Sequence, residues 1–130
     1  MPLISIKGRV VSGMGKGRVF LALHAYQSKI RELAGFTPFA GTLNLQINEN
    51  EWTHFREGLD KQTMETVTEN GKKMGGFDLY KIRFAEDSGG AVIVPHQSTH
   101  PENIIEIVAP VSLREKFELN DNDLLQLKAG

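Results

Sequence analysis

The sequence predicts a small all-β barrel with a few short helices added. Many short segments carry strand patterns, helical patterns are few, and strands do not alternate with helices as they do in a parallel α/β sheet. With 130 residues, the chain is expected to fold as one domain, residues 1–130, with a core large enough to need no disulfide.

The first half of the chain contains the longest helical pattern. Tyr26, Ile30 and Leu33 recur at spacings of three and four residues, and Gly35 follows as a stop signal. The polar stretch 48–53 predicts a turn. The predicted elements of this half are strands at 3–11, 19–23 and 42–47 and a helix at 24–34.

The second half is predicted to consist mainly of strands. E-N-G at residues 69–71 indicates a hairpin turn, and D-S-G-G at 87–90 indicates another turn. Ser112 is placed to cap a short helix that ends at residue 117, with Glu115 three residues further on as in a capping box. The predicted strands of this half are 63–68, 77–84, 91–94, 104–109 and 124–127.

The composition excludes several kinds of site. The chain has no cysteine, which rules out disulfides, thiolate metal sites and a cysteine nucleophile. Its first residues include no apolar run long enough for a signal peptide or a membrane span. We therefore expect a soluble, cytoplasmic protein without a membrane partner.

Charge is distributed unevenly along the chain. Residues 1–31 hold six basic and no acidic residues, whereas the remainder holds nine basic and sixteen acidic residues. A basic first quarter in an acidic protein favours a local anion site over a nucleic-acid surface, which usually makes a whole domain basic. Chance clustering of charges on solvated faces would give the same pattern.

Residues 13–18, G-M-G-K-G-R, form the strongest chemical feature. Glycine at every second position lets backbone N–H groups converge on an anion, and Lys16 and Arg18 add positive charge. The glycine spacing matches neither a Walker loop nor a dinucleotide fingerprint, and a predicted strand rather than a helix follows. A flexible hairpin loop is the alternative interpretation.

The strand predicted at 42–47 alternates polar and apolar residues. Thr42, Asn44 and Gln46 share one face, because side chains in a strand alternate between its two faces. A hydroxyl and a carboxamide are oxygen donors suited to a hard cation or a hydroxylated ligand. An ordinary amphipathic strand with a solvated polar face is the alternative.

Residues 96–100, H-Q-S-T-H, have the histidine spacing of a zinc protease helix. The required glutamate is missing and prolines flank the segment, so a catalytic zinc site is not expected. The hydroxyls of Ser98 and Thr99 are better candidates for ligand contact. Glu106, flanked by apolar residues, either lines a pocket or lies on an exposed edge, and burial would require a hydrogen-bonding partner.

Four motifs together resemble the archaeal CTP-dependent riboflavin kinases. They are S-G-M-G-K-G-R-V-F-L, G-F-T-P-F-A-G-T-L-N-L, G-G-A-V-I-V-P and I-I-E-I-V-A-P-V-S-L-R-E, in the family's order, and the resemblance extends from about residue 6 to 127. It implies a compact six-stranded cradle-loop β-barrel. It also implies a kinase that uses Mg²⁺ and transfers the γ-phosphate of CTP to the 5′-hydroxyl of riboflavin, giving FMN and CDP.

The resemblance also implies roles for individual residues. Nucleotide contacts fall on Met14, Gly15, Lys16, Gly17, Arg18, Val19, Val111, Ser112, Leu113 and Arg114. Mg²⁺ ligands fall on Thr42 and Asn44, and flavin contacts fall on Ser98, with Thr99 as its neighbouring alternative, and on Glu106. No residue is nominated as general base. Lys16 and Arg18 are candidates for stabilising charge on the transferred phosphoryl group.

Three positions depart from the family's pattern. Phe39-Ala40 stands where Tyr-Pro is usual, Ser98 where threonine is usual, and Asn122 where glycine is usual in a D-G-D turn. The Ala40 change is expected to loosen the turn that aims the two metal ligands.

Alternative functions remain open at this level. Related members carry a winged-helix DNA-binding domain before the barrel, and because this chain starts at the barrel we expect no nucleic-acid partner. We also expect a monomer. One alternative is a non-catalytic flavin- or DNA-binding barrel module. Another is a kinase that uses ATP or phosphorylates a different alcohol.

Overall fold

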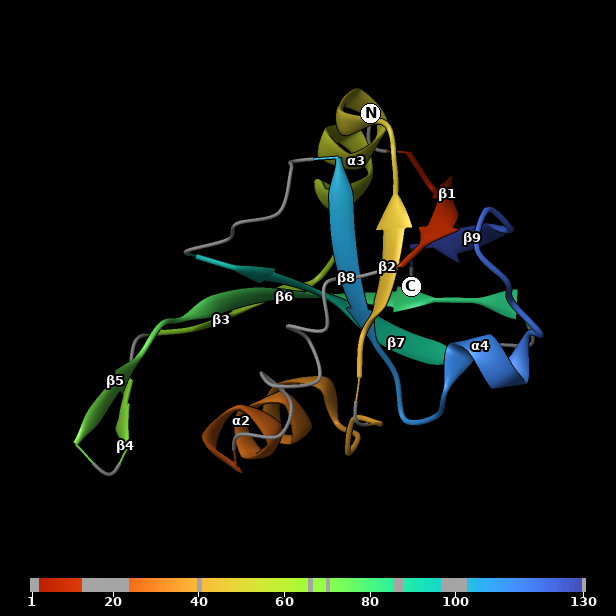
Figure 1. Cartoon of the computed structure of the whole chain (residues 1–130). Coiled ribbons are helices and arrows are strands. Elements are labelled where there is room, and N and C mark those ends of the chain that lie inside the picture. The colour runs from red at the N-terminus through yellow and green to blue at the C-terminus, as the bar shows by residue number, and fades with distance from the viewer. Residues whose placement is uncertain are drawn as a thin grey trace.

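Six antiparallel strands form a closed ring in the computed structural model, which describes residues 3–12, 24–39, 41–65, 67–69, 71–85, 88–96 and 103–129. Around the ring the order is β6–β7–β8–β2–β1–β9, and Arg83 of β6 pairs with Lys128 of β9 to close it (Figure 1). The predicted six-stranded barrel is therefore confirmed. The ring strands are β1 Ser5–Val11, β2 Leu43–Gln46, β6 Phe77–Arg83, β7 Gly89–Pro95, β8 Ile104–Val108 and β9 Leu124–Lys128.

Three further strands extend from one side of the ring. β3 (Lys61–Met64) pairs with the first half of β6, and β4 (Val67–Glu69) and β5 (Lys72–Met74) form a hairpin that projects from the barrel (Figure 1). Gly71, in the hairpin turn, has φ +79°, a conformation that glycine adopts without steric cost. The predicted hairpin is confirmed, whereas the single strand expected at 63–68 is divided between β3 and β4.

The longest helix among the described residues has the predicted bounds. α2 spans His24–Ala34, and Gly35 follows it with φ +84° and donates its N–H to the carbonyl of Arg31 at 3.0 Å. α4 (Leu113–Lys116) begins at the predicted cap, where the Ser112 hydroxyl accepts a hydrogen bond from the Glu115 N–H at 3.4 Å.

The turn predicted at residues 48–53 is wrong, because a third helix, α3 (Glu49–Arg56), occupies this stretch. The Asn48 side chain caps it by accepting a hydrogen bond from the Glu51 N–H at 3.0 Å. Trp52 and Phe55, three residues apart, lie on one helical face and are buried against the barrel core. The prediction failed because most residues of this helix are polar and only one of its faces is buried.

Strand alternation divides the apolar side chains into two clusters. Tyr80 and Val92 point into the barrel, whereas Leu79 and Ile93, their neighbours, belong to an outer cluster that α2 covers. The inner cluster includes Val10, Leu45, Phe55, Phe84, Ile107 and Leu127, and the outer cluster includes Tyr26, Ile30, Met64, Phe77, Leu79 and Ile93.

Two helices lie near opposite ends of β2 and β8. Figure 1 shows α3 at the end toward which β2 runs, and α4 near the end where β2 begins and β8 finishes. None of the helices in the described part of the chain has the length and apolar character that crossing a membrane requires.

Candidate active site

A cavity of about 220 Å³ lies where β2 begins and β8 ends. The antiparallel pairing of Leu43 with Ile107 brings these two segments together, although they are far apart in the sequence. Thr42, a predicted metal ligand, and residues 111–114, a predicted nucleotide segment, therefore share one cavity. The lining residues are Phe39, Gly41, Thr42, Leu43, Ile107, Ala109, Val111, Ser112, Leu113 and Arg114.

The chain entering β2 is fixed to the chain leaving β8. The N–H of Phe39 donates to the carbonyl of Ala109 at 2.8 Å, and Gly41 has φ +119°, a value that a side chain would strain. Phe39 and Val111 remain 47% and 44% exposed beside the cavity, so its rim is apolar. Such a rim is suited to a planar ring.

Asn44 and Glu106 form a buried polar pair next to the cavity. They lie opposite each other on β2 and β8, and each is only 7% exposed. The Asn44 Oδ1 atom is buried and has no hydrogen-bond partner, although an unsatisfied buried acceptor costs about 1–3 kcal/mol. Asn44 is therefore buried, and it does not belong to the solvated polar face considered as the alternative.

This oxygen fits a hard cation. A neutral amide oxygen and a nearby threonine hydroxyl are accepted Mg²⁺ ligands, and Mg²⁺ in enzymes keeps several waters and takes further oxygens from phosphates. Within the described ranges, no group of three or more His, Cys, Asp and Glu side chains could hold a metal ion. A cation at Thr42 and Asn44 would thus depend on waters and substrate phosphates for most of its ligands.

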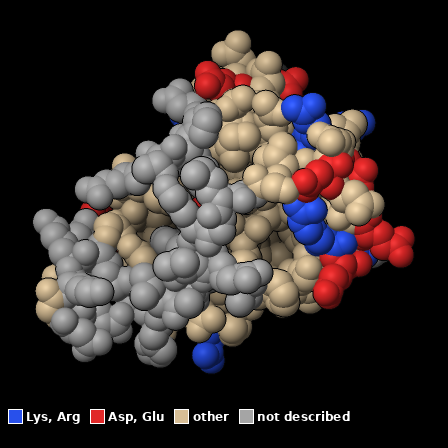
Figure 2. Space-filling model, in the orientation of Figure 1, with Lys and Arg blue, Asp and Glu red and all other residues tan. Residues whose placement is uncertain are grey.

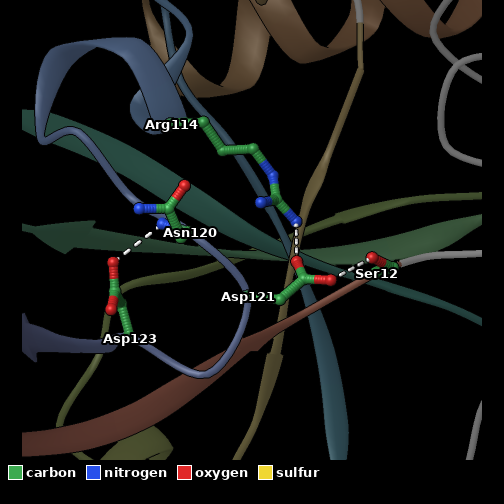
Figure 3. A network of polar contacts seen from close by, with 5 residues as sticks. All are labelled: Ser12, Arg114, Asn120, Asp121 and Asp123. Carbon is green, nitrogen blue, oxygen red and sulfur yellow. Dashed lines mark hydrogen bonds and ion pairs between the residues drawn. The ribbon is translucent and has the colours of Figure 1, made fainter.

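Arg114 is held at the cavity by Asp121. Its Nη2 atom donates to Asp121 Oδ1 at 2.8 Å, and the other carboxylate oxygen accepts from the Ser12 hydroxyl at 2.5 Å (Figure 3). The hydrogen bonds from Ser12 and Arg114 hold the pKa of the Asp121 carboxyl below its ordinary value. Asp121 is therefore ionised at neutral pH. In the sequence this residue lies in the D-N-D turn at 121–123, for which no role in the site was predicted.

A second carboxylate, Asp78, lies away from this site. It accepts hydrogen bonds from Thr63 at 2.9 Å and from His96 Nε2 at 3.1 Å. Burial raises the pKa of Asp78, but these hydrogen bonds outweigh it, so that the pKa lies below its ordinary value.

Strand pairing separates the Asp78–His96 pair from Glu106. Asp78 pairs with Val94, which packs against the inner cluster, whereas Glu106 pairs with Ile93, which belongs to the outer cluster. The two carboxylates consequently face opposite sides of the sheet. His96 is therefore not placed to act on a ligand held beside Glu106.

Several predicted site residues lie outside the described residues. These are the loop residues Met14, Gly15, Lys16, Gly17, Arg18 and Val19, the predicted flavin contacts Ser98 and Thr99, and the strand predicted at 19–23.

The surface near α4 carries charges of both signs. Figure 2 shows basic and acidic side chains side by side over the region of α4 and β9, without a patch of one sign in this view. Arg114 and Asp121 belong to this mixed surface, with side-chain exposures of 40% and 48%. The positive charge at the cavity is thus local.

Comparison with known proteins shows extensive similarity. A family model labelled CTP-dep_RFKase, with the description "Domain of unknown function DUF120", matches residues 10–129. The riboflavin kinase of Saccharolobus solfataricus is 40% identical over 123 residues, which cover 92% of this chain and 70% of that protein.

Two further relatives differ in how much of their length is covered. The riboflavin kinase of Archaeoglobus fulgidus is 36% identical over 96% of this chain, but the chain spans only 54% of that protein. The riboflavin kinase of Sulfurisphaera tokodaii is 33% identical over 97% of this chain and 95% of its own length. The similarity therefore covers most of the chain.

Proposed function

The chain belongs to the family of CTP-dependent riboflavin kinases, and on that premise we propose that it transfers the γ-phosphate of CTP to the 5′-hydroxyl of riboflavin, with FMN and CDP as products and Mg²⁺ as cofactor. The observation that supports this most directly is the arrangement around Asn44. Its unpartnered Oδ1 lies beside Glu106, and β2 begins at a cavity shared by Thr42 and Arg114.

We assign the nucleotide to the cavity and the glycine loop. Residues 111–114 line the cavity, and the loop 14–19 follows directly after Ser12, whose hydroxyl is tied to Arg114 through Asp121. Arg114, Lys16 and Arg18 would then offset phosphate charge. The choice of CTP is supported by the family alone, since no described side chain is matched to cytosine.

Thr42 and Asn44 would hold Mg²⁺, which, when bound, neutralises charge on the phosphates. The neutral oxygens of these side chains leave the charge partners to the nucleotide, as in many phosphoryl-transfer sites. The burial of Asn44 restricts the motion of its side chain, which would reduce the reorganisation needed on binding.

We assign the flavin to the segment around Glu106, with Ser98 and Thr99 as further contacts. The Glu106 carboxylate, 7% exposed, is suited to accepting a hydrogen bond from a flavin N–H or O–H group. Because Asn44 lies opposite Glu106 in the register, a ligand bound at Glu106 would be adjacent to the metal ligands. The acceptor hydroxyl and the phosphates would thereby be held close together.

The proposed reaction needs no dedicated general base. Phosphoryl transfer through a loose transition state depends mainly on positioning and on charge neutralisation. His96 is directed to the other face of the sheet, so we do not assign it a role in proton transfer. The 5′-hydroxyl would lose its proton to the medium or to a phosphate oxygen.

The test is FMN formation from riboflavin and Mg²⁺, measured in parallel with CTP and with ATP as donor. We expect FMN with CTP and little FMN with ATP. Product formed only with ATP would overturn the donor while keeping the kinase. Flavin binding without any product, from folded protein and with either donor, would overturn the proposal in favour of a non-catalytic flavin-binding barrel.

A further inference from the structure

The turn between α4 and β9 brings one carboxylate into contact with two residues that are far apart in the sequence. Figure 3 shows Asp121 between Arg114 and Ser12, with one carboxylate oxygen directed at each. Arg114 lines the cavity, and Ser12 is the last residue before the glycine loop. Asp121 therefore contacts a residue that is 109 positions away in the sequence, Ser12, as well as Arg114 in its own region.

The turn itself is held by other groups. The N–H of Asn122 donates to the carbonyl of Val10 at 2.7 Å, the N–H of Val10 donates to the carbonyl of Asp123 at 2.8 Å, and the Asp123 side chain accepts from the N–H of Asn120 at 2.7 Å. Asn122 has φ +77°, a left-handed conformation that asparagine tolerates. The Asp121 side chain takes no part in these bonds, so the turn does not depend on it.

The Asp121–Arg114 ion pair is poorly suited to stabilising the fold. Both side chains are substantially exposed, and exposed ion pairs contribute little to stability because water and salt screen them. A carboxylate is also unfavourable near phosphates, since like charges repel. Repulsion disfavours a direct phosphate contact by Asp121, and its observed contacts are with Arg114 and Ser12.

Arg114 retains donors while it is held. The bond to Asp121 uses one terminal nitrogen of the guanidinium, which carries five N–H donors in a planar fork. Figure 3 shows the rest of the guanidinium directed away from the carboxylate. The hydrogen bond from Nη2 restricts rotation of the guanidinium and leaves its other N–H groups available to bind a phosphate.

We propose that Asp121 is a positioning residue of the nucleotide site: its carboxylate, bonded to Ser12 through one oxygen and to Arg114 through the other, holds the Arg114 guanidinium at the cavity before nucleotide binds. This inference rests on the proposed function. It assigns to the acidic turn a role in nucleotide affinity, although Asp121 contacts no nucleotide.

The experiment compares D121N with the wild type in four measurements: the KM for CTP, the KM for riboflavin, the Kd for CDP by calorimetry, and the Tm. Removing a negative charge near phosphates should tighten nucleotide binding if charge alone mattered. Loss of positioning should instead raise the KM for CTP and the Kd for CDP about five- to tenfold, as expected for one partly screened charge-assisted hydrogen bond. The KM for riboflavin and the Tm should stay close to wild type.

The matched control is D123N, which removes the same charge from the same turn. Asp123 caps the turn through the Asn120 N–H and touches neither Ser12 nor Arg114, so D123N should lower the Tm and leave the Kd for CDP unchanged. S12A is a second test, because it removes the hydroxyl that donates to Asp121. Combined with D121N it should cost less than the sum of the two single effects, because both substitutions remove the same bond.

The outcomes separate this inference from the proposed function. Equal or tighter CDP binding by D121N, with a wild type that binds CDP, would overturn the positioning role alone. Matching losses in D121N and D123N would also overturn it, because the effect would then reflect general damage to the turn. A folded wild type that binds no CDP would overturn both the positioning role and the kinase.

Discussion

Asn44 combines burial with an unpartnered acceptor, which is rare because most buried polar atoms in folded proteins have a hydrogen-bond partner. An unsatisfied buried acceptor of this kind is unfavourable for the stability of the ligand-free protein. Its neighbour across the strands, Glu106, is equally buried. Each directly adjoins a residue that lines the cavity, Leu43 and Ile107 respectively, so both are candidates for ligand contact.

The first prediction concerns N44L, which replaces the amide by an apolar side chain of similar size. Removing the unsatisfied Oδ1 should leave the free energy of unfolding unchanged or raise it by about 1 kcal/mol. The same change should reduce riboflavin phosphorylation at limiting Mg²⁺ roughly 10- to 100-fold, because a proposed metal ligand is lost. Urea denaturation and Mg²⁺ titration of the activity measure the two effects.

Q46A is the control for N44L, since Gln46 lies two residues further along the same strand face and accepts a hydrogen bond from Arg9. Its Mg²⁺ requirement should equal that of the wild type. Wild-type activity of N44L at limiting Mg²⁺ would remove Asn44 from the metal site.

At the scale of elements, position in the ring decides which residues meet. β2 is only four residues long, yet it lies between β1 and β8 and thereby connects the cavity to the chain before the glycine loop. β7 begins at two adjacent glycines with different surroundings. A Cβ on Gly90 would lie 2.7 Å from a ring carbon of Phe84 and 2.8 Å from the carbonyl oxygen of Val108, whereas Gly89 has open space.

The second prediction follows from this difference. G90A should lower the free energy of unfolding by about 1–3 kcal/mol, because backbone of β8 and a buried ring must move to admit the methyl group. G89A, one residue away, should change it by less than about 0.5 kcal/mol. Urea denaturation of both variants measures the contrast, and equal effects would show that β7 and β8 are packed less closely than the structure indicates.

For the whole molecule, stability depends on contacts that hold the projecting strands to the ring. Asp78 of β6 accepts hydrogen bonds from Thr63 of β3 and from His96 after β7. Its carboxylate therefore joins three segments at one side of the barrel. The lowered pKa of Asp78 makes these contacts dependent on pH.

The third prediction gives the direction of this dependence. Because the pKa of Asp78 is lower in the folded protein than its ordinary 3.8, its contribution is complete above that pH and is lost as the pH falls through the lower folded-state pKa. D78N should lower the free energy of unfolding by about 1 kcal/mol at pH 7 and flatten the acid limb of a plot of Tm against pH. T63V, which removes one donor, should have an intermediate effect, and an unchanged acid limb in D78N would contradict this account.

Local patterns in the sequence were sufficient for much of the fold. The helix 24–34 and its glycine stop were predictable because hydrophobic spacing and a left-handed C-terminal residue are local properties. The hairpin at 69–71 and the Ser112 cap were predictable for the same reason. The helix α3 was missed because polar residues outnumber its two buried aromatic residues, and tertiary packing of Trp52 and Phe55 decides its state.

The sequence by itself determined the residue types of the candidate site and the family to which they belong, because motifs are read without knowing their partners. Only the tertiary structure decided that Thr42 shares a cavity with Arg114, that Asn44 is buried opposite Glu106, and that Asp121 joins Arg114 to Ser12. These contacts depend on the order of strands around the ring. Strand order reflects pairing across long sequence separations, which local propensity and hydrophobic period do not specify.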